Sequence, residues 1–423
     1  MFIYFESFIV FFITLYVIQK NYLEINNHTK NEKLLKILSW FGRIISYEGD
    51  DKSKLKIPFL ILLFGILFRL SLFPTSPTTS PDCYRYVWEG KVLYNGYNPF
   101  DYPPNSPELD HLHSQELPAK VEYKDMAAIY PPLSQLSFAV SYAIFGESLI
   151  GLKIIYLLCE ILTMIYLLKL LNLKKLNLNL ILLYAWLPLP IMEYFINIHL
   201  EPFAIVFMII FIYYIEKGYH LIAAVPFAFA FLAKFYPIIL FPLLIKKIRI
   251  KKTFFFTVIF VFLTLLFYVP FVSDKMGIFK ALSRYLENWD YNSSVFKILQ
   301  MITSNGDTIR LICSIGLMLS IGIIANTYLD FTKAAFGIFI AFIIFSTTVH
   351  PWYLGWLAAI NPVTNFISVL SLFFTAGLTS FSYIGEWHDY TAVVLVEYIS
   401  FFLFLIYDLR KLKKKRIVNA NIE

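Results

Sequence analysis

The residues best suited to catalysis lie between residues 80 and 104, in a stretch that combines aromatic, acidic and amide side chains. Asp82 follows Phe73, the end of a long apolar run, by nine residues, which predicts a position near a membrane surface. A carboxylate there can take the proton of an attacking hydroxyl, an effect worth roughly 10²–10⁴-fold in rate. A leaving phosphate gains negative charge in the transition state and needs a positive partner. Arg85 and Lys234 are the candidates, so these residue types would suit group transfer from a phosphate to a hydroxyl.

Simpler roles remain open for two of these residues. Asp82 and the nearby Ser80 both favour a helix N-cap, a role that is compatible with catalysis. Lys234 could extend to the membrane interface and have no further task. The residues alone therefore leave a structural and a catalytic interpretation side by side.

Residues 83–95 predict a short helix that lies in the membrane interface. Tyr84 and Trp88 fall near its apolar face, as is typical of interfacial helices. Asn98 belongs to a turn-forming Asn-Pro pair that ends the segment. Tyr130 then precedes two prolines at the start of the next apolar run.

A second polar group is predicted around residues 193–201. Glu193 lies within an apolar run, and ionisable residues inside membrane segments are costly and usually line a cavity. His199 and Glu201 follow between two runs, where they could bind an acceptor, while a solvated loop explains them equally well. His-x-Glu alone is a poor metal signal. Nothing requires a cofactor and we predict no metal ligand; a divalent metal held weakly by His199 and Glu201 stays open, but the pattern gives it no support.

Two later segments carry residues that suit sugar binding. Trp289 and Asn292 lie in the polar connection 273–308, and His350 and Tyr353 lie at the end of a later apolar run. Aromatic rings and amides bind sugars by stacking and hydrogen bonding. Anchoring in the aromatic belt at the membrane interface is the alternative for Trp289, His350 and Tyr353.

The composition predicts an integral membrane protein. Of 423 residues, 58% are hydrophobic and only 15% are charged, against roughly 25% charged residues in soluble domains. Apolar runs recur along the chain, and a run of about 20 residues spans a bilayer, so we expect an all-α polytopic bundle of about 11–13 membrane segments. The net charge of +7 does not indicate nucleic-acid binding, because the basic residues flank apolar runs. Three scattered cysteines form neither a metal spacing nor a disulfide framework.

Basic residues set the expected orientation. Segment 20–56 carries eight lysines and arginines, 246–252 carries five and 410–416 carries six. The positive-inside rule predicts that all three are cytoplasmic. Segments 74–132 and 273–308 are then extracytoplasmic loops.

The chain divides into three parts on this basis. Residues 1–56 form a membrane helix and a basic cytoplasmic segment, 57–407 form the transmembrane catalytic domain, and 408–423 form a basic cytoplasmic tail. The apolar start is read as a retained helix rather than a signal peptide, since no basic residue precedes it and no cleavage site follows.

The topology between residues 133 and 245 is harder to predict. If every apolar run crossed once, counting 133–146 as a crossing, His199 and Glu201 would face the cytoplasm. Runs 179–197 and 219–245 contain prolines and look broken, which is tolerated where a segment lines a cavity. If both turn back near the outer surface, His199, Glu201 and Lys234 face outward. Lys174 and Lys175 would then also lie outside, against the charge rule.

At these residues the sequence resembles the integral membrane glycosyltransferases of the GT-C superfamily, most of all the polyprenyl-phosphate-mannose-dependent, family-87-like type. The specific likeness lies in Asp82, Arg85, Tyr86, Trp88, Glu89, Gly90, Gly96, Asn98, Pro99 and Phe100, then Tyr130, Pro131, Pro132 and Gln135. Weaker likeness continues at residues 234–237, 289–292 and 350–353.

The resemblance implies a large first outer loop that carries the catalytic base, Asp82, in an inverting single displacement. The donor would be a polyprenyl-phosphate sugar, the acceptor a lipid or glycan, and the site would face outward from the plasma (inner) membrane. Many relatives carry a paired acidic motif in this loop, which is absent here because Cys83 follows Asp82. Arg85 and Lys234 would bind the donor phosphate. The expected substrate-binding residues are Tyr84, Trp88, Glu89, Asn98, Tyr130, Gln135, Glu193, His199, Glu201, Trp289, Asn292, His350 and Tyr353.

Two other functions stay open. Broken helices and Glu193 also suit a flippase or transporter of lipid-linked sugars, although the hydropathy shows no inverted repeat. A glycan polymerase or ligase would use a diphosphate-linked donor, so the identity of the donor separates it from the transferase.

Overall fold

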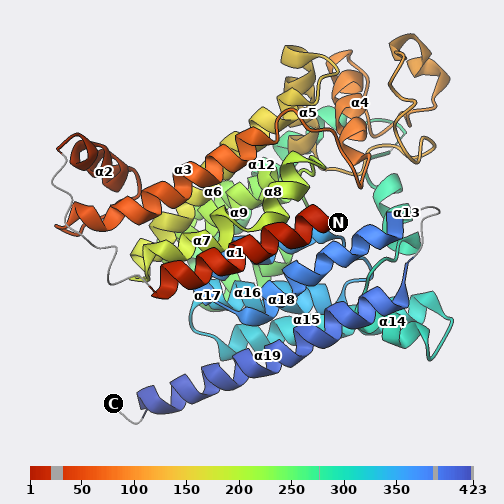
Figure 1. Ribbon diagram of the computed structural model, residues 1–423. Coiled ribbons are helices and arrows are strands. Elements are labelled where there is room, and N and C mark those ends of the chain that lie inside the picture. Colours follow the sequence, from red (N-terminus) through yellow and green to blue (C-terminus); the bar gives the residue numbers. More distant parts are fainter. Residues whose placement is uncertain (21–31, 276, 384–388, 421–423) are drawn as a thin grey trace.

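The computed structural model describes residues 1–20, 32–275, 277–383 and 389–420, and these segments are predominantly helical (Figure 1). The only β pairing within these ranges is an isolated bridge between Tyr291 and Thr348. The all-α prediction is confirmed. A helix satisfies its own backbone hydrogen bonds, which lipid cannot do for it.

The helices follow one another with short connections apart from the two polar loops. Their bounds are α1 (Phe2–Lys20), α2 (Glu32–Ile44), α3 (Lys56–Ser71), α4 (Asp82–Tyr94), α5 (Pro132–Phe145), α6 (Ile150–Leu173), α7 (Leu182–Ala185), α8 (Pro188–Phe195), α9 (Glu201–Glu216), α10 (His220–Ala233), α11 (Phe241–Lys247), α12 (Ile250–Tyr268), α13 (Lys280–Asn288), α14 (Val295–Gln300), α15 (Gly306–Thr327), α16 (Phe331–Phe345), α17 (Gly355–Thr364), α18 (Ile367–Thr375) and α19 (Thr391–Ala420). Short 3₁₀ helices include Leu178–Ile181, Tyr236–Leu240 and Pro351–Leu354.

Several helices are long and apolar enough to cross a membrane. Within the described residues, four segments meet this test by length and composition: Ile150–Leu173, Ile250–Phe271, Gly306–Thr327 and Thr391–Lys414. The segments Leu178–Ala185 and Pro188–Phe195 make one further span that is bent by 46°. Shorter apolar helices include Phe2–Ile18, His220–Ala233 and Phe331–Phe345. The chain is thus a multi-pass membrane protein.

Both predicted breaks are present. The bend between α7 and α8 lies at Pro188, the first residue of α8. Helix α10 ends at Ala233, and Lys234 has extended backbone angles of φ −157° and ψ 138°. Pro237 follows in the next 3₁₀ helix. A proline lacks an amide hydrogen and disfavours helical geometry in the residue before it, which explains why both runs are interrupted.

One end of the bundle gathers the basic segments, and we call it the basic end. The Asn172 amide donates to the carbonyl of Ser46, just beyond α2, at 2.7 Å. Lys174 forms ion pairs with Glu216 and Asp330 at 2.8 and 2.7 Å. Lys247 donates to the carbonyl of Tyr328, only two residues before Asp330. The α19 residue Leu412 lines the same cleft as Tyr328 and Lys333.

The two polar loops meet at the opposite end, which we call the site end. Asn98 donates to the carbonyl of Phe271 at 2.9 Å, and Arg284 pairs with Asp125 at 2.7 Å. Figure 1 shows α4, α13 and α14 at the far end of the bundle from α2 and the C-terminus. The prediction that both loops share a side, opposite the basic segments, is confirmed.

Helix α5 accounts for the topology that the sequence left unsettled. Near its start, Ser134 donates to the carbonyl of Ala233 at 2.7 Å, beside Lys234. Just after its end, Glu147 pairs with Lys91 of α4 at 2.7 Å. Both ends of α5 therefore lie at the site end. The expectation that residues 133–146 cross the membrane was wrong, because α5 packs along α4 instead.

When α5 is not counted as a membrane crossing, the order of the helices places every basic segment at one end of the bundle and both polar loops at the other. Helix α6 runs to the basic end, α7 and α8 return, α9 runs back, and α10 returns to Lys234. The expectation that Lys174 and Lys175 lie on the outer side was therefore also wrong. Only run 219–245 turns back at the site end, whereas run 179–197 traverses the bundle with a bend.

A buried ion pair fixes the bent helix to its neighbours. Arg69 of α3 and Glu160 of α6 are both fully buried, and their closest atoms are 2.7 Å apart. Arg69 also donates to the carbonyl of Ala185 at 2.8 Å, and Tyr184 donates to Glu160. Breaking a buried pair typically costs about 3–5 kcal/mol, so this network stabilises the α3–α6–α7 junction.

Candidate active site

Asp82 begins helix α4 with its carboxylate free of a capping role. Pro81 occupies the N-cap position, without a side-chain cap bond, and the Asp82 amide instead donates to Ser80 Oγ at 3.3 Å. The N-cap interpretation is therefore wrong for Asp82. An acidic residue in the first turn is still favoured by the helix dipole. Its side chain is 34% exposed, which leaves the carboxylate accessible to a substrate.

His199 lies between Asp82 and Glu193. Its Nδ1 is 3.8 Å from Asp82 Oδ2 and its Nε2 is 3.6 Å from Glu193 Oε2. The imidazole is fully buried, and neither nitrogen has a hydrogen-bond partner within the described residues. Asn197 donates to Glu193 Oε2 at 3.1 Å. Asp82 thus forms one array with Glu193 and His199, which were predicted as a second polar group in a separate segment.

An aromatic stack holds the His199 ring. Its centroid is 3.5 Å from that of Trp352, with an interplanar angle of 16°. Trp352 stacks in turn on His350 at 4.3 Å and 3°, and His350 stacks on Tyr291 at 4.8 Å. Trp352 and Tyr353 are buried within the protein. The segment 350–353 therefore packs inside the protein against the site, rather than anchoring in lipid.

Lys234 forms the positive part of the site. Its ammonium group forms an ion pair with Glu201, the first residue of α9, and both side chains are buried. The nitrogen lies 4.6 Å from the ring centroid of Tyr353 and 5.2 Å from that of Tyr236. The second carboxylate oxygen of Glu201 has no partner within the described residues. Because Lys234 is paired and enclosed, it does not extend to the interface as the simpler interpretation required.

Burial and neighbouring charges set the protonation of the site. Burial, followed by the negative charge of Glu122, raises the pKa of Asp82 to about 6, while Arg85 and Lys234 oppose the shift. Burial and then the positive charges of Lys234 and His350 hold the pKa of His199 well below its usual value. At neutral pH, Asp82 is therefore largely ionised and His199 is neutral. A base whose pKa lies near the working pH is well matched to proton abstraction.

Arg85 ties α4 to the first loop. Its Nε pairs with Glu89 Oε1 at 3.0 Å. The remaining guanidinium N–H groups donate to the carbonyls of Glu122, Tyr123, Met126 and Ala127. Gln135 of α5 donates to Glu89 Oε2 at 2.7 Å, which extends the network. Burial raises the pKa of Glu89. In this geometry a phosphate could reach Arg85 only by displacing backbone carbonyls.

Other expected binding residues lie around this centre or away from it. Tyr130 Oη is 3.4 Å from Tyr86 Oη, and Trp289 stacks on Tyr285 at 5.3 Å between centroids. Trp88 is buried 5.6 Å from the ring of His113.

The remaining three residues make structural contacts within the loops and with α19. Tyr84 lies under the ammonium of Lys120 at 4.9 Å. Asn98 bonds within its own turn, to Asp101. Asn292 donates to Glu397 of α19 at 2.9 Å.

Three site residues were missed by reasoning from the sequence. Trp352 lies within the aromatic segment 350–353, between the predicted residues His350 and Tyr353, so the sequence pattern could have identified it. Tyr236 lies two residues after Lys234, at the predicted helix break, so the sequence pattern could have identified it too. Tyr285, whose Oη is 3.0 Å from Tyr353 Oη, carries no local signal, because only the tertiary fold brings α13 to this point. Within the described residues, no group of three or more His, Cys, Asp or Glu side chains could hold a metal ion.

One comparison with known proteins is informative. Residues 51–248 match the family model described as alpha-(1→6)-mannopyranosyltransferase, N-terminal domain. The matched segment includes Asp82, Glu193, His199, Glu201 and Lys234, but ends before the aromatic segment 350–353. No curated protein matches the chain.

Proposed function

We propose that this chain, whose residues 51–248 match the alpha-(1→6)-mannopyranosyltransferase family model, is a membrane glycosyltransferase that moves a mannose from a polyprenyl-phosphate carrier to a hydroxyl of a lipid or glycan. The observation that carries the proposal is the accessible Asp82 carboxylate beside the Lys234–Glu201 pair. A base and a cation held by separate helices are what this displacement needs. The proposed donor distinguishes the enzyme from nucleotide-sugar transferases.

Asp82 acts as the general base in this proposal. As the acceptor oxygen attacks the anomeric carbon, Asp82 takes its proton, and the bond from the anomeric carbon to the phosphate oxygen breaks. The bonding electrons leave with the polyprenyl phosphate, and the anomeric configuration inverts. The pKa of about 6 leaves Asp82 ionised at neutral pH and ready to accept the proton.

Lys234 stabilises the leaving phosphate. Its ammonium lies between Glu201 and two tyrosine rings, where little water competes for it. Charge stabilisation is stronger in such a site than in water. Glu201 holds Lys234 in place before the donor arrives, and the phosphate would then share the ammonium. Arg85 contributes indirectly, by holding the loop 122–127 over the site.

The aromatic segment 350–353 forms the sugar-binding wall. Tyr353 presents a hydroxyl toward Tyr285. His350 and Trp352 are already stacked against other rings on both faces, so they support this wall from within rather than stack on the sugar. Trp289, at the rim, is partly exposed and packs edge-on against Tyr123 at 4.8 Å. The Tyr353 hydroxyl and the partly exposed Trp289 ring offer the hydrogen bonding and stacking that a hexose requires.

The site faces outward from the plasma membrane in this proposal. All three basic segments gather at the opposite end of the bundle, and the positive-inside rule makes that end cytoplasmic. The donor phosphate and the acceptor would therefore both be reached from the extracytoplasmic side.

Transfer of radiolabelled mannose from synthetic polyprenyl-phosphate-mannose tests the proposal. The intact protein should label a membrane lipid or glycan, and Asp82→Asn should lose at least about 10²-fold in rate. Asp110→Asn, in the same loop but with a side chain 69% exposed, should keep full activity. Full activity of Asp82→Asn would overturn the role of Asp82.

A change of donor separates the alternatives. Transfer only from a diphosphate-linked oligosaccharide would identify a polymerase or ligase. Movement of lipid-linked sugar across sealed vesicles, without a new glycosidic bond, would identify a transporter.

A further inference from the structure

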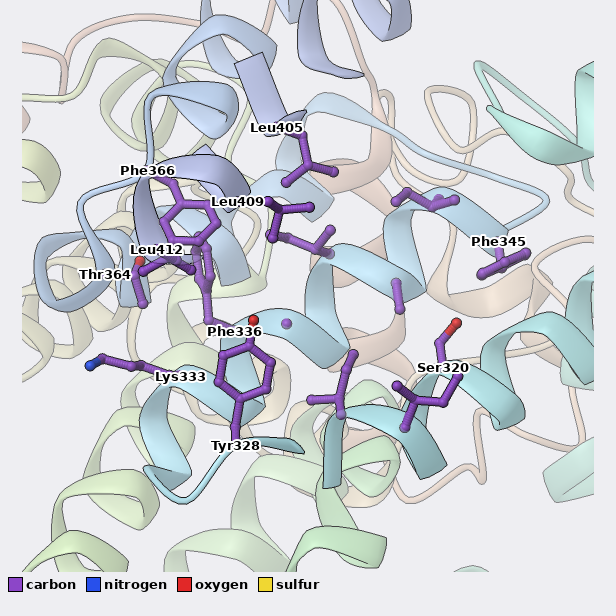
Figure 2. Close-up of a pocket in the computed structure, with 16 residues that line it drawn as sticks. Ser320, Tyr328, Lys333, Phe336, Phe345, Thr364, Phe366, Leu405, Leu409 and Leu412 are labelled. Carbon is purple, nitrogen blue, oxygen red and sulfur yellow. The ribbon is translucent and has the colours of Figure 1, made fainter. Parts of the chain in front are cut away.

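An apolar cleft lies between α15, α16 and α19, lined by residues separate from those of the candidate active site. Its volume is about 270 Å³. Figure 2 shows Phe336, Leu409 and Leu412 around it, with Lys333 at one edge and Phe345 at the other. The mannosyltransferase family match ends at residue 248, so it does not include any part of this cleft.

The lining of the cleft selects a hydrocarbon chain. Its walls are leucine, isoleucine and phenylalanine side chains with few polar atoms. An apolar cavity offers water no hydrogen-bond partners. The two flanking spans are largely unburied in the protein, with 22% of the α15 window and 28% of the α19 window buried. The cleft therefore lies between surfaces that face lipid.

The edge of the cleft at the basic end carries lysine side chains that would attract an anionic group. Lys333 is exposed there, and Lys411 and Lys413 of α19 flank the lining residue Leu412. The three nearby acidic residues are already engaged. Glu216 pairs with Lys174 at 2.8 Å and accepts the amide of Thr332 at 2.8 Å. Asp330 pairs with Lys174 at 2.7 Å, and Asp408 accepts the amide of Ser368 at 2.9 Å. Positive charge therefore remains available for a phosphate.

The length of the cleft matches one leaflet. From Lys333 to Phe345 it follows α16 for about 18 Å, at 1.5 Å per helical residue. Half of the hydrocarbon core is roughly 15 Å thick. A chain that enters at Lys333 would fill the cleft from the basic end, whereas the phosphate of the proposed donor belongs at the other end of the bundle. This geometry favours a diacyl lipid over the polyprenyl carrier.

We propose that this cleft binds one acyl chain of an anionic phospholipid, with the lipid phosphate at Lys333. Helix α16 leads directly into the aromatic segment 350–353. A chain packed along α16 would therefore support the wall of the candidate active site from behind.

Native mass spectrometry of the full chain tests lipid retention, with dioleoyl phosphatidylglycerol and dioleoyl phosphatidylcholine as probes. The intact protein should retain one phosphatidylglycerol in preference to phosphatidylcholine. Gly337→Leu should abolish retention, because Gly337 lines the cleft and an added Cβ meets only Ile324, at 3.5 Å. Gly322→Leu is the matched control, since an added Cβ there meets nothing within 4 Å.

Lys333→Gln tests the headgroup separately, without filling the cleft. It should lower the preference for phosphatidylglycerol roughly fivefold, the effect of one lysine near an anionic membrane surface. Lys251→Gln, an exposed lysine at the basic end, should leave the preference unchanged. Equal retention by Gly337→Leu and the intact protein, no preference for phosphatidylglycerol, or co-purified polyprenyl phosphate in the cleft would each overturn the proposal.

Discussion

At the scale of single residues, the array of Asp82, His199 and Glu193 is the most informative feature. A neutral imidazole has one N–H group and one acceptor nitrogen. If Nδ1–H points to Asp82, Nε2 is the acceptor nitrogen and can only accept a hydrogen bond, so Glu193 must be protonated to donate one to it. The ring is held by Trp352, so we propose that His199 positions Asp82, the proposed base.

Glu193→Gln and Glu193→Ala test this arrangement. The glutamine amide can donate to Nε2 as the protonated acid does, so Glu193→Gln should keep most of the activity. Glu193→Ala should lower kcat by about tenfold, equivalent to ~1.4 kcal/mol. The measurement is mannose transfer at saturating donor. If the glutamine and alanine variants were equally impaired, Glu193 would have to act as a charged group instead.

The pH profile tests the protonation of Asp82. Its pKa of about 6 is raised from the usual value first by burial and then by Glu122. The active, ionised form is lost as the pH falls through 6, so kcat/KM at pH 5 should be roughly one tenth of its plateau. Glu122→Gln removes a negative charge and should shift this limb to lower pH. If the acid limb of the kcat/KM profile stayed at the same pH in Glu122→Gln, the two carboxylates would not be coupled.

At the scale of elements, the contact between α4 and α5 positions Asp82, the proposed base. Gly90 of α4 packs directly on the backbone of α5, where an added Cβ would lie 2.3 Å from the carbonyl oxygen of Phe138. Only glycine allows this approach. The close contact keeps α5 beside α4 and Asp82 beside His199.

Gly90→Ala should therefore both destabilise the protein and impair transfer. Overpacking of this kind costs typically 1–3 kcal/mol, and the displaced α4 would move Asp82 away from His199. Thermal unfolding of the purified chain and mannose transfer measure the two effects. Gly306→Ala, where a Cβ meets nothing within 4 Å, should change neither. A normal melting temperature for Gly90→Ala would contradict the tight packing.

At the scale of the whole molecule, the separation of charge defines the orientation. Basic segments from three parts of the chain gather at one end, and the two polar loops contact each other at the opposite end. In a bilayer, this arrangement predicts which end faces the cytoplasm.

Cysteine labelling in intact cells tests the orientation. Cysteine introduced at Asp110 should react with a membrane-impermeant maleimide added outside. Cysteine introduced at Lys251 should react only after permeabilisation. The native residues Cys83, Cys159 and Cys313 are buried and should give little background. The reverse pattern would place the site in the cytoplasm and exclude the proposed extracytoplasmic transfer.

Much of the site could be predicted because its residues carry local signals. Asp82 follows an apolar run, Glu193 is a charge within one, and Lys234 interrupts another beside Pro237. Each is unusual for its surroundings and marks a special position. Trp88 and Asn98 show the limit of this reasoning, since the same local features also describe residues that only shape the loop.

By itself, the sequence determined the helical class, the membrane location and the shared side of the two polar loops, since these follow from hydrophobicity and charge along the chain. Only the tertiary structure decided that α5 stays at the site end, which required the contact at Gly90. It also decided that Tyr285 and Trp352 join Asp82, although more than two hundred residues separate them in the chain. Such contacts depend on packing between distant helices, and no local pattern records which helices will meet.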